Sequence, residues 1–145
     1  MTRFARIALI ILLYFGALSA IGGGILGTVD NGGGVPLEYL RSTPFTSYLI
    51  PSLILGIVIG GTQGAAAILL HRRNAYSSGA ATVAGFGMMI WIFVELAIIG
   101  YDVLQTLYFG LGALEVLLVL GLVGALGPAV KTSTTQSVTR RQRHR

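Results

Sequence analysis

Four long apolar segments alternate with short polar segments along this chain, and their lengths predict four membrane-spanning helices. We expect these helices over residues 7–27, 44–70, 77–101 and 107–126. A bilayer core needs about 20 predominantly apolar residues in a helix, and each segment reaches that length. The pattern predicts an all-α polytopic membrane protein, with four transmembrane helices in an antiparallel bundle over residues 1–128 and a polar segment over 129–145.

Small residues recur at every fourth position in two of these segments. In the second segment the series is Gly56, Gly60 and Gly64. A four-residue spacing places such residues on one face of a helix, where they allow close packing against a neighbour. The first segment carries an equivalent series: Gly16, Ala20 and Gly24. The two small-residue faces are therefore predicted to meet.

The first segment has an alternative interpretation as a secretory signal peptide. Ala17-Leu18-Ser19 resembles a cleavage site with small residues at its two ends. The apolar run continues to Val29, however, and a signal peptide has an apolar region of only about 7–15 residues. We therefore expect an uncleaved first helix.

Two local features interrupt the regular pattern. Leu37 and Leu40 are spaced for a single helical turn at the membrane surface, although an ordinary loop explains them equally well. Pro51 falls inside the second segment. Because proline lacks the N–H that a helix interior needs, it predicts a kink there.

Composition agrees with the membrane assignment and excludes several kinds of chemistry. The chain is 54% hydrophobic and 10% charged, whereas soluble domains carry about 25% charged residues. Cysteine is absent, which rules out disulfides, thiolate nucleophiles and cysteine-bound metal or iron–sulfur centres. Both histidines, His71 and His144, lie in polar segments on the same predicted side, so a haem cannot be held inside the bundle. The sequence predicts no catalytic residues, no cofactor and no metal.

The distribution of basic residues predicts the orientation. Of the ten lysines and arginines, Arg41 alone falls on one side of a four-helix arrangement, and the other nine fall on the opposite side. Because cytoplasmic loops carry the excess of positive charge, both termini and the turn over residues 71–76 are predicted to be cytoplasmic. The basic segment 129–145 is predicted to be a disordered cytoplasmic tail. These charges are interpreted as topology signals, and no nucleic acid partner is expected.

Three polar side chains inside the apolar segments are the candidates for chemistry: Glu95, Glu115 and Gln63. Glu95 and Glu115 are expected at comparable depth on adjacent helices. An ionised carboxylate is costly there, so we expect protonation, a hydrogen bond or a cationic partner. Proton-coupled transport is one interpretation, and a structural carboxyl bonded to Gln63 or another polar group is the other. Gln63 itself is expected to bond between helices, with substrate binding as the alternative.

Three further segments of the sequence are informative together: Thr43-Pro44-Phe45-Thr46-Ser47-Tyr48-Leu49-Ile50-Pro51, Ile90-Trp91-Ile92-Phe93-Val94-Glu95 and Leu107-Tyr108-Phe109-Gly110-Leu111-Gly112. These segments resemble a family of small four-helix bacterial membrane proteins. Thr43 stands where that family tends to have serine, and Ser52 where glycine is usual. The resemblance implies a bacterial membrane protein, and the family has no assigned activity. Its members also carry Gln at the position of Glu95, which argues against an obligatory proton carrier.

These observations together predict a small integral protein of the bacterial inner (plasma) membrane that is not an enzyme. The leading hypothesis is a structural or accessory membrane subunit that packs through its glycine faces against its own helices or against a partner. Its partners would be the lipid bilayer and either further copies of the chain or another membrane protein. The alternative is a small proton-coupled transporter that uses Glu95. An enzyme acting on lipid is a third, weaker hypothesis.

Overall fold

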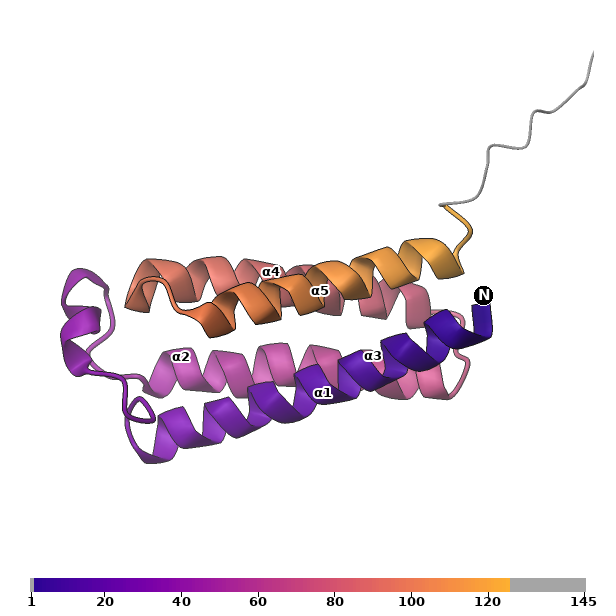
Figure 1. Cartoon of the computed structure of the whole chain (residues 1–145). Helices are drawn as coiled ribbons and strands as arrows, with labels where there is room; N and C mark the ends of the chain where they lie inside the picture. Colours follow the sequence, from indigo (N-terminus) through magenta and orange to yellow (C-terminus); the bar gives the residue numbers. More distant parts are fainter. Residues whose placement is uncertain (1, 126–145) are drawn as a thin grey trace, which may run out of the picture.

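The computed structural model describes residues 2–125, which form a bundle of four long helices (Figure 1). The first is α1 (Thr2–Val29), and the second is continuous through α2 (Leu49–Leu53), the π-helical turn η2 (Ile54–Ile59) and α3 (Gly60–His71). The third and fourth are α4 (Ser77–Ile99) and α5 (Val103–Leu122). All four are long and apolar enough to cross a membrane, which confirms the predicted fold class. The predicted tail, residues 129–145, lies outside the described residues.

The helices follow one another around the bundle in chain order. The continuous α2–η2–α3 helix packs between α1 and α4, and α5 packs between α4 and α1. Successive long helices run antiparallel, so the chain start and the turn over residues 72–76 share one end of the molecule (Figure 1). The opposite end carries the 3-10 helix η1 (Leu37–Ser42) and the turn over residues 100–102. We refer to these as the N-terminal end and the η1 end.

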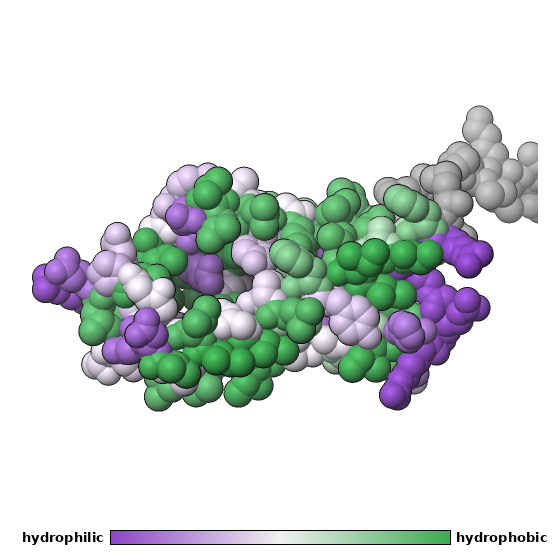
Figure 2. All heavy atoms as spheres, turned by 60° about the horizontal axis from the view of Figure 1, so that its bottom comes forward, coloured by the Kyte–Doolittle hydropathy of each residue, from purple (hydrophilic) through white to green (hydrophobic). Residues whose placement is uncertain are grey.

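The flank of the bundle is apolar. Figure 2 shows hydrophobic atoms along the side of the molecule and hydrophilic atoms gathered at its two ends. Large apolar side chains point outward from every long helix, for example Ile11 and Ile57, which are 61% and 69% exposed. Such a surface suits lipid, because hydrocarbon imposes no penalty on apolar side chains. The chain is a multi-pass membrane protein.

The second long helix begins at Leu49 instead of residue 44, because Tyr48 is held by the loop before it. The backbone N–H of Tyr48 donates to Asn31 Oδ1 at 3.0 Å, and its hydroxyl donates to the carbonyl oxygen of Pro36 at 2.9 Å. Gly32 packs against the ring, where a Cβ would lie 2.6 Å from Tyr48 Cδ2. This loop contains η1, so of the two alternatives left open for Leu37 and Leu40, a helical turn or an ordinary loop, the helical turn forms.

The fourth helix begins at Val103, four residues before the predicted residue 107, because Asp102 and Gln105 form a capping box. Asp102 Oδ1 accepts from the Leu104 N–H at 2.8 Å, and Gln105 Oε1 accepts from the Asp102 N–H at 3.1 Å. The two side chains satisfy N–H groups that a helix start leaves free. The polar residues Asp102 and Gln105, which the sequence suggested as a turn between helices, therefore form the start of α5.

Pro51 does not interrupt the second helix in the way its sequence position suggested. It is the third residue of α2, and the first turn of a helix needs no N–H from it. The irregular stretch is instead η2, three residues further along. Leu55 and Gly56 lie in this π-helical turn, where the helix is locally widened.

The small-residue faces of the first two long helices lie against each other. A Cβ on Gly24 would sit 2.6 Å from the Cα of Gly56 and 2.8 Å from the carbonyl oxygen of Ser52. A Cβ on Gly60 would sit 2.6 Å from Ile21 Cγ1, and one on Gly64 would be 3.8 Å from the Cβ of Ala17. These distances leave no room for larger side chains at positions 24 and 60. Gly56, Gly60 and Gly64 thus line the contact with α1.

The N-terminal half of the bundle is tightly filled. Its core consists of small and branched apolar residues from all four long helices: Leu9, Leu13, Ala66, Ala67, Leu70, Ala81, Ala84 and Val119. Between α4 and α5 the contact is again backbone to backbone, because a Cβ on Gly85 would meet the carbonyl oxygen of Gly112 at 2.9 Å. Arg6 donates to the Leu70 carbonyl oxygen at 2.7 Å, which satisfies the C-terminal end of α3.

Replacing Gly24 by alanine tests the close packing of α1 on the second long helix. The added methyl group would collide with the backbone at Gly56, so we expect a loss of about 1–3 kcal/mol in the free energy of unfolding. Reversible unfolding of the purified protein in mixed micelles measures this loss. The matched control is Gly22→Ala in the same helix, where a Cβ meets nothing within 4 Å. Alanine there should be neutral or slightly stabilising, and equal stability of the two variants would contradict the proposed contact.

Candidate functional site

A buried polar pair crosses the middle of the bundle. Gln63 on α3 and Glu115 on α5 are both fully buried, and Gln63 Nε2 donates to Glu115 Oε2 at 2.9 Å. The same amide nitrogen also donates to the carbonyl oxygen of Ala84 on α4 at 3.3 Å. Gln63 thereby links three of the four long helices through one side chain.

The remaining long helix, α1, approaches this pair through a glycine. A Cβ on Gly16 of α1 would lie 2.9 Å from Gln63 Oε1, so the amide fills the space that a side chain at position 16 would need. Glu115 is placed by the contact of α4 with α5, where a Cβ on Gly85 would be 3.3 Å from the Cβ of Glu115. Small residues therefore create the compartment that holds the pair.

One oxygen of each partner lacks a hydrogen-bond donor within the described residues: Gln63 Oε1 and Glu115 Oε1. A carboxylate and an amide oxygen are both acceptors, so an ionised Glu115 would leave the compartment with a charge and a shortage of donors. A proton on Glu115 removes the charge and adds a donor. We infer that the pair works as a neutral carboxylic acid and an amide.

Glu95 and Glu115 lie at different depths, contrary to the sequence-based expectation. Glu115 is beside Gly85, and Glu95 follows Gly85 by ten residues, which is about 15 Å along a helix. The expectation was wrong because α5 begins four residues earlier than predicted and α4 ends two residues earlier, at Ile99. Glu115 therefore lies further from the turn than expected, and Glu95 lies nearer to it. The two carboxyls therefore belong to separate sites.

Glu95 is paired within its own helix. Trp91, one turn earlier on α4, donates its indole Nε1–H to Glu95 Oε1 at 2.6 Å. Glu95 is only partly buried, and the structure gives its other oxygen no hydrogen bond within residues 2–125. One carboxyl oxygen of Glu95 is thus held by Trp91, and the other is without a partner among the described residues.

Beside Glu95 lies a cavity of about 570 Å³ in the half of the bundle near the η1 end. Its walls come from the four long helices, from η1 and the loop before it, and from the turn over residues 100–102, and they are mainly apolar and aromatic. The lining residues nearest the N-terminal end are Ser19, Met88 and Tyr108. A second cavity of about 240 Å³ adjoins the first and shares Leu55, Trp91 and Glu95 with it. Figure 2 shows the molecular surface hollowed in this half, with hydrophilic atoms inside the hollow.

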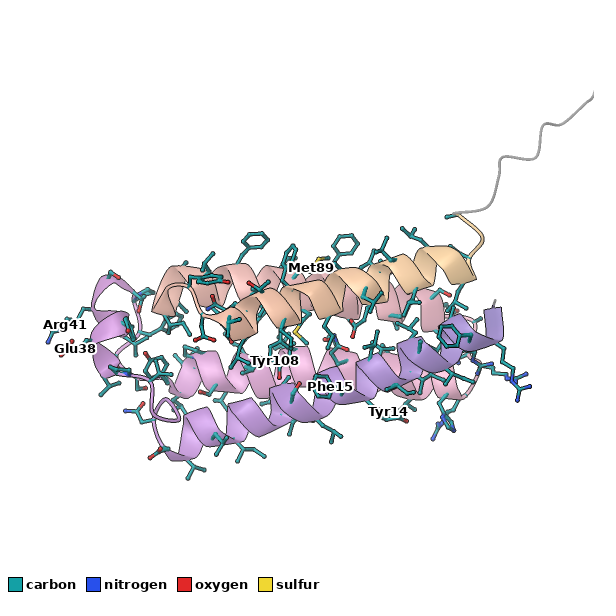
Figure 3. The ribbon with its side chains drawn as sticks, viewed as in Figure 1. Tyr14, Phe15, Glu38, Arg41, Met89 and Tyr108 are labelled. Carbon is teal, nitrogen blue, oxygen red and sulfur yellow. The ribbon has the colours of Figure 1, made fainter. Side chains whose placement is uncertain are left out.

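An aromatic pair marks the closed end of the cavity on the side of α1 and α5. The rings of Phe15 and Tyr108 stack with centroids 6.4 Å apart, and Figure 3 shows them facing each other from the two helices. Beyond this pair, toward the η1 end, α1 and α5 diverge (Figure 1). The cavity occupies the space that this divergence leaves.

The structure brings together two of the three polar side chains that the sequence suggested, Gln63 and Glu115, and leaves Glu95 apart from them. Gln63 was named as one alternative partner for a buried carboxyl, and the structure brings it to Glu115. The bond from Trp91 to Glu95 was missed, although the four-residue spacing of a donor and an acceptor on one helix is a usable signal. The cavity was missed entirely, since no local sequence pattern encodes the divergence of two distant helices.

No protein-family model, curated protein or solved structure matches this chain. The resemblance to a family of small bacterial membrane proteins stays a prediction. Within the described residues, no cluster of histidine and acidic side chains is suited to hold a metal ion. The polar pair and the cavity beside Glu95 are therefore the features from which a function can be argued.

Two substitutions of Glu115, which differ in size, test whether it acts as a neutral partner of Gln63. Glu115→Gln retains an oxygen that accepts from Gln63 and adds a donor for Gln63 Oε1, so we expect the unfolding free energy to stay within about 1 kcal/mol of wild type. Glu115→Ala leaves the amide unpaired and opens a void, which should cost about 2–5 kcal/mol. Unfolding titrations in micelles measure both.

Leu114→Ala is the control for truncation on the same helix, because Leu114 is 45% exposed on the lipid-facing flank and its loss should have a small effect. If Glu115→Gln is as unstable as Glu115→Ala, the site needs an ionised carboxylate and the neutral pair is refuted.

Proposed function

We propose that this chain is an accessory membrane subunit that holds an apolar or amphipathic guest in the cavity beside Glu95, without transporting or chemically changing it. The guest is either a small molecule or a group carried by a partner membrane protein. The observation that carries this proposal is the shape of the cavity, which opens in one half of the bundle and ends inside it.

The closed end of the cavity argues for holding rather than transport. The cavity ends at Ser19, Met88 and Tyr108 on the side of the N-terminal end. The buried layer of Gln63 and Glu115 follows in that direction, and the apolar core of the N-terminal half lies beyond this layer. Gly85 and Gly112 bring the backbones of α4 and α5 into direct contact beside Glu115, so opening a path there would require separating these two helices. A solute inside the cavity therefore meets a filled interior on the side of the N-terminal half.

The chemistry of the cavity wall supports a binding role over an enzymatic one. Its polar lining includes Glu95, Asp102 and Gln105. The last two are committed to the capping box that starts α5. The remaining carboxyl and hydroxyl groups of the described lining are the carboxyl of Glu95 and the hydroxyls of Ser19 and three tyrosines. This lining offers no histidine, lysine or second uncommitted carboxyl to act as a general base beside Glu95.

The proposed location is the plasma membrane of a bacterium, with the termini in the cytoplasm. The support is the excess of basic residues at the N-terminal end, where Arg3, Arg6, Arg72 and Arg73 cluster, against Arg41 at the η1 end. Under the positive-inside rule the cavity would lie in the outer half of the membrane. A guest would then reach it from the outer leaflet or from outside the cell.

The second candidate is a proton-coupled transporter that uses Glu95. One observation favours it, namely that this carboxyl lines both cavities and keeps one oxygen free. Alternating access would have to open the N-terminal half. Pyranine-loaded vesicles that contain the chain under an imposed pH gradient separate the two candidates. If the chain only holds a guest, vesicles with wild type and vesicles with Glu95→Gln should leak protons at the same rate. If it is a proton-coupled transporter, vesicles with wild type should leak protons faster than vesicles with Glu95→Gln.

Native mass spectrometry of the chain extracted with its lipids tests the holding role directly. We expect wild type to retain a bound mass, and Ser19→Phe to lose it because the new ring fills the cavity. Leu18→Phe is the matched control, since Leu18 is 72% exposed on the flank of the same helix and should leave the bound mass in place. Equal retention by the two phenylalanine variants would place the guest elsewhere and refute the proposal.

A further inference from the structure

The larger cavity carries acidic side chains without a basic counterpart. Among its lining residues within the described part of the chain, Glu95 and Asp102 are acidic, and none is lysine, arginine or histidine. A carboxylate held among apolar walls is unfavourable unless an opposite charge or donors compensate it. The indole of Trp91 supplies one donor. A guest that brings positive charge would supply the rest.

Aromatic rings surround the same space. Trp91, Tyr39, Tyr101 and Tyr108 line the cavity together with the carboxyl of Glu95. The faces of such rings attract organic cations, and the attraction grows when the cation is removed from water. Rings and a carboxylate in one pocket are the combination that recognises ammonium-type groups carrying apolar substituents.

We propose that the larger cavity binds an amphipathic organic cation, with its charged centre beside the free oxygen of Glu95 and its apolar body against Leu55, Met88 and Ile92. The volume of about 570 Å³ falls in the range of roughly 300–1,000 Å³ that small-molecule sites occupy. This assignment rests on the proposed holding function and narrows it to one class of guest.

The same walls disfavour a phospholipid headgroup in this position. A phosphate needs basic side chains or a cluster of N–H donors, and the described lining offers no basic side chain. Arg41, the basic residue at the η1 end, is exposed and does not line the cavity. The guest is therefore a cation that carries no phosphate.

The single tryptophan of the chain reports on this site, because Trp91 lies in the cavity wall and bonds Glu95. The full chain in micelles is titrated with tetraphenylphosphonium and, separately, with tetraphenylborate, while tryptophan fluorescence is followed. The two ions match in size and shape and differ in the sign of their charge. We expect a saturable change with the phosphonium ion, at an affinity at least about tenfold higher than for the borate.

Glu95→Gln should weaken phosphonium binding by about tenfold or more, because it removes the charge and keeps an oxygen that accepts from Trp91. Glu38→Gln is the matched control: Glu38 is exposed on η1, outside the cavity lining, so this variant should bind as wild type does. The comparison of the two ions on wild type decides the question even if a variant fails to fold.

Three results would overturn the assignment. If the phosphonium and borate ions bind equally, or Glu95→Gln binds the phosphonium ion as tightly as wild type, the cavity does not select positive charge. Saturable binding of both ions would then still leave the holding function intact. A saturable tryptophan response to neither ion would refute the cation site, and absence of a bound mass on wild type as well would refute the holding function too.

Discussion

Hydrocarbon cannot satisfy a polar group, and this constraint decides how the middle of the bundle is built. An amide or carboxyl facing lipid would cost several kcal/mol, so such groups must find partners inside the protein. Gln63 and Glu115 do so by bonding each other, and the second hydrogen of the amide reaches the Ala84 carbonyl oxygen. This one interaction fixes α3, α4 and α5 relative to one another. It also forms a polar layer between the filled half of the bundle and the hollow half.

Close backbone contact is what makes such a layer geometrically possible. Gly16 leaves room for the Gln63 amide, and Gly85 brings α4 up to Glu115. Where small residues meet at this level, as at Gly85 and Gly112, the helices touch along their backbones. Toward the η1 end α1 and α5 diverge, and larger side chains such as Trp91 line the space left between them. One bundle thus combines a sealed half with a half that can accept a guest.

The sequence was sufficient for the number of helices and the fold class, because length and hydropathy alone determine whether a segment can cross a membrane. It was insufficient for the rotation and depth of each helix, on which every side-chain pairing depends. Reading Asp102 and Gln105 as a turn instead of a capping box shifted the start of α5 by four residues and gave Glu115 the wrong depth. The cavity could not be predicted, since it results from how two helices far apart in the chain diverge.

Because the chain lacks cysteine, single cysteines can test most directly whether the cavity ends at the polar layer. One is placed in the cavity wall by Ser19→Cys and one in the sealed half by Ala67→Cys, where Ala67 is fully buried. In folded protein in lipid nanodiscs, a small methanethiosulfonate reagent should modify position 19 and leave position 67 unmodified until the protein is unfolded. Comparable rates at both positions in the folded state, or no reaction at position 19, would contradict a bundle with one open and one sealed half.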